Sequence, residues 1–518
     1  MYGHPIVRLS AYRVLLPLVI ISLLFVGSGI TPPAVGEALW QETRFTTGCE
    51  PGPSHTPPWP EHRETHVPAA GPALQATLRI DLDSAAAQRP ILGSGFNFEH
   101  ALWSCPAFRG LFRREILDPF TPAVARVDTG LLPVAPPNLS ADELGPDVYA
   151  SMLSSPQYAD SWRFMKRLNR AGVKIALGVW GGPAQFTADG TRRGRLLPRH
   201  YDDYVEYVAS VVDYIVRGQD VDIWAITIAN EPDGGDGTQI PPDGLAYIGH
   251  YLAPRLEPLG VRLYGPDTAD ASWAMEYLPP LLDDPVIANR LAFVGFHQYY
   301  PNPDVATVVD YVRARRPDLP VIITEYTSFG FGDLDDGQEV NDRLGYTLDI
   351  VNMLLAHYRY GVDAAIYWDA IDYLQPGHDA ITRWGLLRGP ARDFARRTRY
   401  YGMLQVLPYL QPGARVLNSA LDGRGGPDAL AVQTPSGAPA IFVVNQQSEE
   451  IDLTIELSGS GADRFDEFTV WRTDRGYKAE RLGRLQVADG SGRMSIPPRS
   501  LTTLFPSGAA TVPGDPES

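Results

Sequence analysis

Hydrophobic and polar positions along the body of the chain follow the pattern of strands alternating with helices. Eight short apolar runs are typical of strands buried on both faces, and amphipathic helical stretches lie between them. These runs occupy residues 91–98, 123–129, 173–180, 223–230, 261–267, 291–299, 321–326 and 363–370. The clearest helical stretch, residues 199–216, has Tyr201, Tyr204, Val208, Val211 and Ile215 at three- and four-residue spacing. Eight strands, each followed by a helix, predict a closed (β/α)8 barrel.

An open doubly wound sheet is the alternative arrangement of such a pattern. It would need a phosphate-binding, glycine-rich turn that leads from the first strand into a helix. The glycine-rich residues 93–96 (GSGF) are not followed by a helix, which argues against this alternative. We therefore assign residues 91–410 to the barrel and predict that a final helix over residues 390–410 closes it.

The pattern changes on both sides of the barrel. Residues 411–506 contain short alternating runs broken by Gly, Pro and Asp, which is typical of an antiparallel β-sandwich. Residues 74–84 alternate like a half-buried strand, and we expect residues 74–90 to join this sandwich. We expect residues 507–518 to form a disordered tail.

The front of the chain has the layout of a targeting segment rather than of a folded element. Within residues 1–38, Arg8 and Arg13 precede an apolar run of 13 residues, and small residues follow. This layout predicts a secretory signal peptide, with an uncleaved membrane anchor as the alternative, and hence a secreted or extracytoplasmic protein. Residues 39–73 are rich in proline, and we interpret them as a linker or surface strap. The histidines in this segment match no metal-ligand spacing. In an exported protein Cys49 and Cys105 either form one disulfide or stay free.

Composition excludes some partners and favours others weakly. The net charge of −17, with no block of Lys or Arg, argues against nucleic acid and anionic membrane surfaces as partners. The 25 Tyr and 10 Trp residues suit stacking on sugar rings, although the same residues are ordinary core material.

Two glutamates stand at strand ends, where the active sites of (β/α)8 barrels gather. Glu231 follows the fourth run and Glu325 lies near the end of the seventh, on opposite sides of the expected barrel mouth. A retaining glycosidase uses such a pair about 5–5.5 Å apart, one as acid/base and one as nucleophile. We predict that Arg126 and a Tyr hydroxyl keep Glu325 ionised. We also predict that the nearby negative charge raises the pKa of Glu231, so that it holds its proton.

Further side chains at the strand ends suit the binding of a sugar. We predict that Asn230 donates to a sugar hydroxyl, that Trp180 and Trp368 stack on rings, and that His297 and Tyr299 orient the nucleophile or a hydroxyl. Each has a structural alternative: an Arg126–Asp128 ion pair, tryptophans packed at the barrel top, and His297 as a hydrogen-bonded support. Asn97 and Glu99 are predicted to be structural or distal, and the acidic residues 333–342 to form a solvated loop rather than a calcium site.

Taken together, these residues resemble clan A of the glycoside hydrolases, which carry Asn-Glu-Pro after the fourth barrel strand and a nucleophilic Glu after the seventh. The matching residues are Asn230-Glu231-Pro232 and Thr324-Glu325, supported by Arg126, His297-Gln298-Tyr299 and Trp368. A barrel with a sandwich built from both chain ends is most similar to family 30, with families 5, 39 and 79 as alternatives. The chain departs from the family 30 pattern at Gly181-Gly182-Pro183, in the turn after the third strand.

The resemblance implies hydrolysis of a β-linked oligo- or polysaccharide with retention, through a covalent glycosyl-enzyme. It assigns Glu231 as acid/base and Glu325 as nucleophile, and implies no metal or organic cofactor. A transglycosylase using the same site is one alternative, and a non-catalytic carbohydrate-binding barrel, which would not need both glutamates, is another. A serine or zinc hydrolase is disfavoured because the sequence lacks GxSxG and HExxH motifs.

Overall fold

The computed structural model describes residues 73–98, 103, 105–128, 138–328, 344–372, 384–389, 394–423 and 426–507, all within one compact unit of the chain. Several predictions therefore lie outside the described residues. They concern the targeting segment, the proline-rich linker, Glu99, the acidic residues 333–342 and the C-terminal tail. Cys105 is a buried free thiol, and Cys49 lies outside the described residues.

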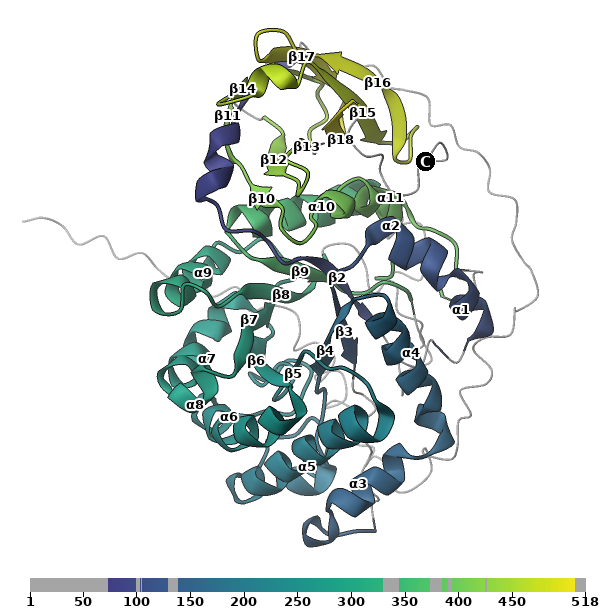
Figure 1. Cartoon of the computed structure of the whole chain (residues 1–518), viewed down its shortest axis with the longest axis vertical. Coiled ribbons are helices and arrows are strands. Elements are labelled where there is room, and N and C mark those ends of the chain that lie inside the picture. Colours follow the sequence, from purple (N-terminus) through teal and green to yellow (C-terminus); the bar gives the residue numbers. More distant parts are fainter. Residues whose placement is uncertain are drawn as a thin grey trace, which may run out of the picture. The chain divides into compact units, whose positions relative to one another are not determined.

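Eight parallel strands close into a barrel in chain order (Figure 1). They are β2 (Gly93–Phe98), β3 (Val124–Asp128), β4 (Lys174–Gly178), β5 (Ala225–Thr227), β6 (Arg262–Thr268), β7 (Leu291–His297), β8 (Val321–Tyr326) and β9 (Ala364–Tyr367). Each strand overlaps one of the eight predicted apolar runs, because a strand buried on both faces leaves little room for polar side chains. The predicted (β/α)8 barrel is confirmed.

Helices surround the barrel and connect its strands. They are α1 (Pro106–Phe112), α2 (Asp118–Phe120), α3 (Pro146–Leu153), α4 (Ala159–Arg170), α5 (Tyr201–Asp213), α6 (Pro242–Leu256), α7 (Ala271–Asp283), α8 (Pro285–Ala288), α9 (Asp304–Arg315), α10 (Leu344–Arg359) and α11 (Thr398–Leu404). In α5 the predicted stripe is present, with Tyr204, Val208 and Val211 buried. The Asp270 carboxylate caps α7 by accepting from the Ser272 amide, which fixes the start of that helix near the end of β6.

The helix predicted over residues 390–410 is wrong in its extent. α11 begins only at Thr398 and ends at Leu404, and a 3₁₀ turn follows at Leu407–Tyr409. Before α11 the chain is extended, because Arg396 forms a β-bridge with Leu387 and its guanidinium bonds Glu115 at 2.7 Å. These tertiary contacts override the helical pattern of the sequence.

Two sheets form the accessory domain, one ordered β11-β1-β14-β17 and the other β10-β12-β13-β18-β15-β16. Their strands are β1 (Leu74–Asp81), β10 (Arg415–Val416), β11 (Asn418–Asp422), β12 (Asp428–Gln433), β13 (Pro439–Asn445), β14 (Ile451–Ser458), β15 (Glu467–Thr473), β16 (Glu480–Gln486), β17 (Ser491–Ile496) and β18 (Ser500–Pro506). The sandwich is confirmed, but it is not wholly antiparallel. β1 pairs with β14 in parallel. β1 precedes the barrel in the sequence and the other strands of the sandwich follow it, so β1 and β14 are not joined as a hairpin.

One strand of the sandwich, β16, has no clear sequence signal. Most of its side chains are exposed, and only Leu485 is buried, so its pattern lacks the alternation of a half-buried strand. β16 lies at the edge of its sheet, where charged and short strands protect against pairing with another chain.

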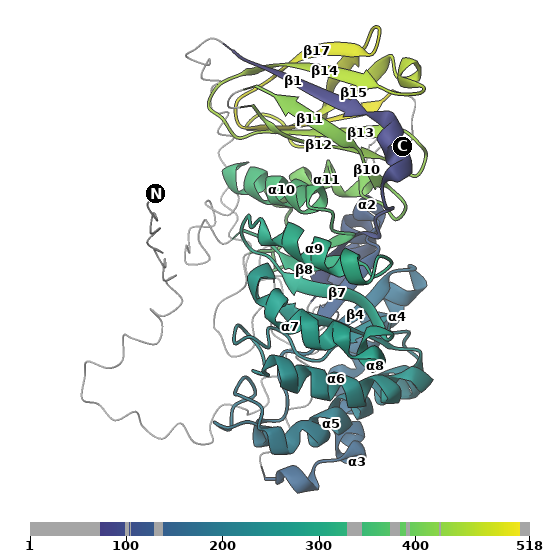
Figure 2. The same ribbon diagram turned by 90° about the vertical axis from the view of Figure 1, so that its left-hand side faces the viewer.

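The sandwich packs on the helices after the barrel's last strands. α10 contacts β9 on one side and β12, β13 and β18 on the other (Figures 1 and 2). The Tyr409 ring lies 5.9 Å from the Phe442 ring and 4.8 Å from the Phe505 ring. The barrel core therefore continues into the sandwich.

Inside the barrel, small apolar side chains fill the end where the strands begin. Ala176, Ala225 and Ala364 pack there around Tyr264 and Phe293, whose rings stack at 4.5 Å. Polar side chains occupy the opposite end, where the strands finish. Of the helices that the structure describes, none has the length and apolar character needed to cross a membrane.

Candidate active site

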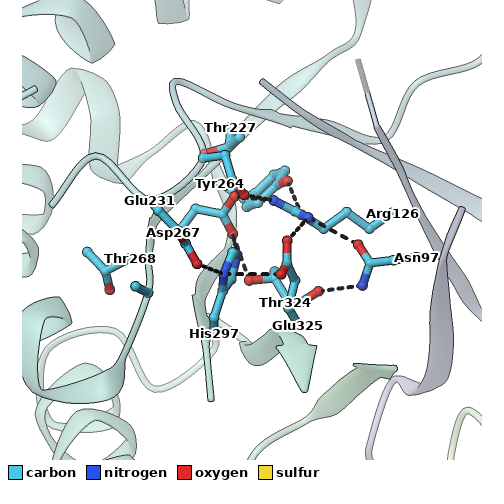
Figure 3. A network of polar contacts seen from close by, with 12 residues as sticks. Asn97, Arg126, Thr227, Glu231, Tyr264, Asp267, Thr268, His297, Thr324 and Glu325 are labelled. Carbon is cyan, nitrogen blue, oxygen red and sulfur yellow. Dashed lines mark hydrogen bonds and ion pairs between the residues drawn. The ribbon is translucent and has the colours of Figure 1, made fainter. Parts of the chain in front are cut away.

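The two predicted glutamates meet at the mouth of the barrel. Glu231 follows β5, Glu325 is the fifth residue of β8, and their exposed fractions are 8% and 3%. One oxygen of each carboxylate and one nitrogen of His297 all lie within 4.8 Å of one another (Figure 3). This separation is close to the carboxylate spacing of about 5–5.5 Å found in retaining glycosidases.

Glu325 accepts hydrogen bonds on both carboxylate oxygens. Arg126, from β3, donates from Nη1 to Oε1 at 2.5 Å, and the Tyr299 hydroxyl donates to Oε2. Burial raises the pKa of Glu325 above its usual value, and the charges of His297 and Arg126 oppose that rise. The two donors hold the carboxylate in one orientation and favour its ionised form, but burial outweighs them in the net direction of the pKa, so the ionisation of Glu325 stays a prediction.

Arg126 lies at the centre of a wholly buried polar network (Figure 3). Its Nη2 donates to Asp267 at 2.8 Å and to Asn230 Oδ1 at 2.6 Å, and its Nη1 also donates to Asn97 Oδ1 at 3.0 Å. The described ion-pair partners of Arg126 are Asp267 and Glu325, whereas the Asp128 side chain lies outside the described residues.

The two asparagines are held by the protein itself. Asn97 donates from Nδ2 to the Thr324 carbonyl at 3.0 Å and so ties β2 to β8 behind the nucleophile. Asn230, predicted to donate to a sugar hydroxyl, donates one N–H to the Asp236 carbonyl at 2.8 Å. An amide carries two N–H groups, and this bond uses one of them, so donation to a sugar hydroxyl stays a prediction.

His297 lies between the three carboxylates and is fully buried. Its Nδ1 is 2.9 Å from Glu231 Oε1 and 3.4 Å from Glu325 Oε2, and its Nε2 is 3.5 Å from Asp267 Oδ1. Burial alone would lower the pKa of His297, but Glu325, Asp267 and Glu231 raise it to about 10. The imidazole is therefore protonated at neutral pH.

The predicted direction of the Glu231 pKa is wrong for the free site. Burial favours the protonated carboxyl, but the hydrogen bond and charge of His297 and the Asp236 N–H lower the pKa of Glu231 below its usual value. The prediction counted only the neighbouring negative charge and left out these two donors. The lowered pKa of Glu231 and the raised pKa of His297 together favour the imidazole as the carrier of the proton between them.

A glycine-rich loop, residues 233–237, wraps around the Glu231 carboxylate. The Asp236 N–H donates to Glu231 Oε2. A Cβ on Gly235 would lie 2.0 Å from that same oxygen, and one on Gly237 would lie 1.7 Å from the Asn230 carbonyl oxygen. Only glycine allows the backbone to approach the acid this closely.

Glu231 and Asp267 share an unusual backbone conformation. Their φ angles are 41° and 62°, in the left-handed region that non-glycine residues rarely adopt. The Glu231 N–H donates to the Asp267 carbonyl at 2.9 Å, which couples the two turns. Such conformations persist where the surrounding structure enforces them, and they cluster at functional sites.

The two predicted tryptophans lie side by side. The Arg126 guanidinium carbon is 4.3 Å from the centre of the Trp180 ring, and the Trp180 and Trp368 rings are 5.9 Å apart. Trp180 is 9% exposed, whereas Trp368 is half-buried. The Trp180 ring thus packs against the Arg126 guanidinium, and Trp368 exposes the larger part of its side chain.

Sequence reasoning missed two members of the network. Asp267 joins Arg126 to His297, and those cations lower its pKa to about 2 against the effect of burial. The Tyr264 hydroxyl accepts from Arg126 Nε at 3.1 Å. Asp267 ends the fifth predicted run, so reading that strand end like the others would have found it. Tyr264 carries no such signal.

The same cluster has the composition of a metal site. Glu231, His297 and Glu325 are the one group of three potential ligands found close together among the described residues. A ligating histidine must be neutral, but the carboxylates here keep His297 protonated, and Arg126 already pairs with Glu325. The arrangement fits proton transfer better than metal binding.

No protein-family model matches the sequence, and no curated protein matches it either. Solved structures do share its fold. A family 30 endoxylanase from Clostridium papyrosolvens has a TM-score of 0.61 and 16% identity over 83% of this chain and 99% of its own. An endo-β1,6-glucanase has a TM-score of 0.60 and 16% identity over 83% and 93% of the two chains. The family 39 enzyme from Xanthomonas axonopodis has a TM-score of 0.54 and 16% identity over 86% and 99%. The predicted resemblance to clan A, and to family 30 within it, is confirmed at the level of the fold.

Proposed function

We propose that this chain is a retaining glycoside hydrolase that cleaves β-linked oligo- or polysaccharides by double displacement. Glu325 is the nucleophile and Glu231 the acid/base. The observation that carries the proposal is the approach of the two carboxylates to within 4.8 Å in unequal surroundings. Glu325 receives a permanent cation and a hydroxyl, whereas Glu231 shares a proton with His297.

In the first step a Glu325 oxygen attacks the anomeric carbon while the bond to the leaving oxygen breaks. The leaving oxygen takes a proton from Glu231, which draws it from His297 Nδ1 across 2.9 Å. The charge of Glu325 is the largest single effect that raises the pKa of His297, and it disappears as the ester forms. The imidazolium therefore becomes a stronger acid when the leaving group needs the proton.

In the second step water attacks the anomeric carbon and the ester bond to Glu325 breaks. Glu231, now a carboxylate, accepts the proton of the attacking water and passes it to His297. The sugar leaves with its original anomeric configuration, and both glutamates return to their starting charge. Arg126 and Tyr299 stabilise the released carboxylate.

The surroundings of the two glutamates support a carbohydrate substrate. Trp368 provides an aromatic face, and His297 and Tyr299 place polar groups beside the two glutamates, where the reacting carbon would lie. The targeting segment within residues 1–38 supports action outside the cytoplasm, on an extracellular polymer.

The experiment is a screen of β-linked polysaccharides and aryl β-glycosides, with product anomers followed by NMR. We expect retention of configuration. A Glu325→Ala variant should lose at least about four orders of magnitude in kcat, as expected for loss of a catalytic nucleophile. Azide should partly restore its turnover and yield the glycosyl azide of inverted configuration.

A second variant separates the acid role from general damage to the site. Glu231→Ala should lose far more activity on polysaccharides than on aryl glycosides whose leaving groups need no proton. Equal losses on both substrate types would contradict Glu231 as the acid. Transfer of the sugar to an added alcohol in preference to water would identify a transglycosylase. Binding without any turnover would identify a carbohydrate-binding protein.

A further inference from the structure

Two exposed aromatic side chains stand at the rim of the barrel mouth. Trp273 is the third residue of α7, and Tyr300 is the third residue after β7 ends; their exposed fractions are 47% and 45%. Aromatic side chains of this size are usually covered, because an exposed ring forgoes its burial free energy. Among the described residues, the other large apolar side chains this exposed are Tyr247, Tyr251 and Tyr477, which lie on α6 and in the sandwich.

Both rings follow strands that carry residues of the site. β6 and β7 are neighbouring strands, and they carry Asp267 and His297 of the site. Tyr300 follows His297 by three residues, so their Cα atoms are at most ~11 Å apart. Trp273 lies in the first turn of α7, where side chains tilt toward the helix start and thus toward the barrel mouth.

The loop around Glu231 touches this part of the rim. The Ala269 amide donates to Asp233 at 3.1 Å, and Asp267 accepts from the Glu231 amide. The rim that carries Trp273 and Tyr300 therefore adjoins the residue assigned to protonate the leaving group.

One buried carboxylate fixes the backbone next to Trp273 and bonds the Tyr300 side chain. Asp270, which is 5% exposed, accepts from the Ser272 amide at 2.7 Å, from Asn302 Nδ2 at 3.2 Å and from Gln298 Nε2 at 3.3 Å. Burial and a hydrogen bond with Asp270 raise the pKa of Tyr300 to about 12. Gln298 also donates to the Tyr300 carbonyl at 2.7 Å. A ring held in this way, as that of Tyr300 is, loses little conformational entropy when a ligand stacks on it.

We propose that Trp273 and Tyr300 form an outer sugar-binding subsite on the leaving-group side of the scissile bond. This inference rests on the proposed function and adds to it a polymeric substrate that extends beyond the rim. Each ring stacks on the apolar face of a pyranose unit. The nearby carboxylates of Asp233 and Asp270 disfavour an anionic sugar, so the subsite takes a neutral one.

Binding is measured separately from catalysis in a Glu325→Gln background. The probes are β-1,4-xylan, β-1,6-glucan and β-1,4-glucan. Each polymer is cast in a native gel, where it slows the migration of a protein that binds it. We expect retardation by at least one polymer, and about a ten-fold weaker apparent affinity after Trp273→Ala or Tyr300→Ala, the size of one lost stacking contact. Tyr300→Phe keeps the ring and should stay near the starting affinity.

Two variants control for the loss of any exposed aromatic side chain. Tyr247→Ala and Tyr477→Ala should leave polymer binding unchanged. No retardation by any of the three polymers, or equal retardation of rim and control variants, would overturn the subsite.

The catalytically competent chain gives a second, independent measurement. An aryl glycoside carries no sugar on the leaving-group side, so the ratio of kcat/KM on polymer to kcat/KM on the aryl glycoside should fall about ten-fold in the rim variants. An unchanged ratio would contradict the subsite while leaving the glutamate chemistry intact. The chain could instead show no hydrolytic activity but bind a polymer, and lose that binding in the rim variants. That result would contradict the proposed reaction and support the subsite.

Discussion

Two histidines, one at the barrel mouth and one on the barrel wall, are equally buried and behave in opposite ways. His297 and His357 have exposed fractions of 0% and 1%. Carboxylates around His297 raise its pKa to about 10, whereas burial lowers the pKa of His357 to about 3. Neither ring nitrogen of His357 has a hydrogen-bond partner, and its nearest described ring is that of Tyr326, edge-on at 5.7 Å.

The difference shows what each region is built for. On the wall, burial favours the neutral form of His357, whose ring makes an edge-on contact with Tyr326 between α10 and β8. At the mouth, Arg126, Asp267 and His297 are as deeply buried, and Asp267 lies 2.8 Å from Arg126 and 3.5 Å from His297, so that opposite charges favour the charged form of each. Burying charged groups has a desolvation cost that an apolar core does not have. Such groups cluster at functional sites, which points to chemistry at the mouth.

The largest expected effect comes from removing one charge at the mouth. Asp267→Asn leaves Arg126 and His297 with one carboxylate fewer, and we expect a loss of about 3–5 kcal/mol in the free energy of unfolding. Denaturant unfolding monitored by tryptophan fluorescence measures this loss.

The matched control is the more exposed pair Asp452–Arg493 in the sandwich, whose atoms are 2.7 Å apart, against 2.8 Å for Asp267 and Arg126. Asp452→Asn should leave the unfolding midpoint unchanged because solvent screens the pair. Similar losses for the two variants would show that burial of the mouth network does not matter.

The fold was predictable because its signals are local. Runs such as VIITEY place β8 correctly, since a strand buried on both faces must be apolar throughout. The strand ends then locate Glu231, Glu325, Arg126 and His297 without any knowledge of contacts. β16 escaped prediction because an exposed edge strand has no such constraint.

The protonation pattern was not predictable for the opposite reason. Whether Glu231 or His297 holds the proton depends on the 2.9 Å contact between them and on the Asp236 N–H. Neither contact follows from spacing along the chain. Asp267 was overlooked although it ends a predicted strand, because one Asp after Gly-Pro also reads as an ordinary turn.

The next effect in size is a pH dependence of stability at the mouth. The folded pKa of His297, about 10, lies above the unfolded value of 6.5, so its contribution is fully present below pH 6.5 and is lost as the pH rises through about 10. Between pH 7 and pH 9 the wild type should lose about 2–3 kcal/mol relative to His297→Gln.

Unfolding free energies of both proteins across this pH range measure the difference. His250→Gln, which removes an exposed histidine 2.7 Å from Asp284, is the control and should follow the wild type. Parallel curves for the wild type and His297→Gln would contradict a protonated imidazole between the glutamates.

The smallest effect has the opposite sign and lies on the wall. His357 has a folded pKa of about 3, below the unfolded 6.5, so the protein loses stability as the pH falls below 6.5 because the unfolded chain takes up the proton first. Replacing the ring by a group that does not titrate removes this loss. His357→Phe should therefore be more stable than the wild type at pH 5, and its advantage should be about 2 kcal/mol larger there than at pH 7. Paired unfolding curves at the two pH values measure it. An advantage that does not grow on acidification would mean that His357 finds a proton partner when charged, and the contrast between wall and mouth would then fail.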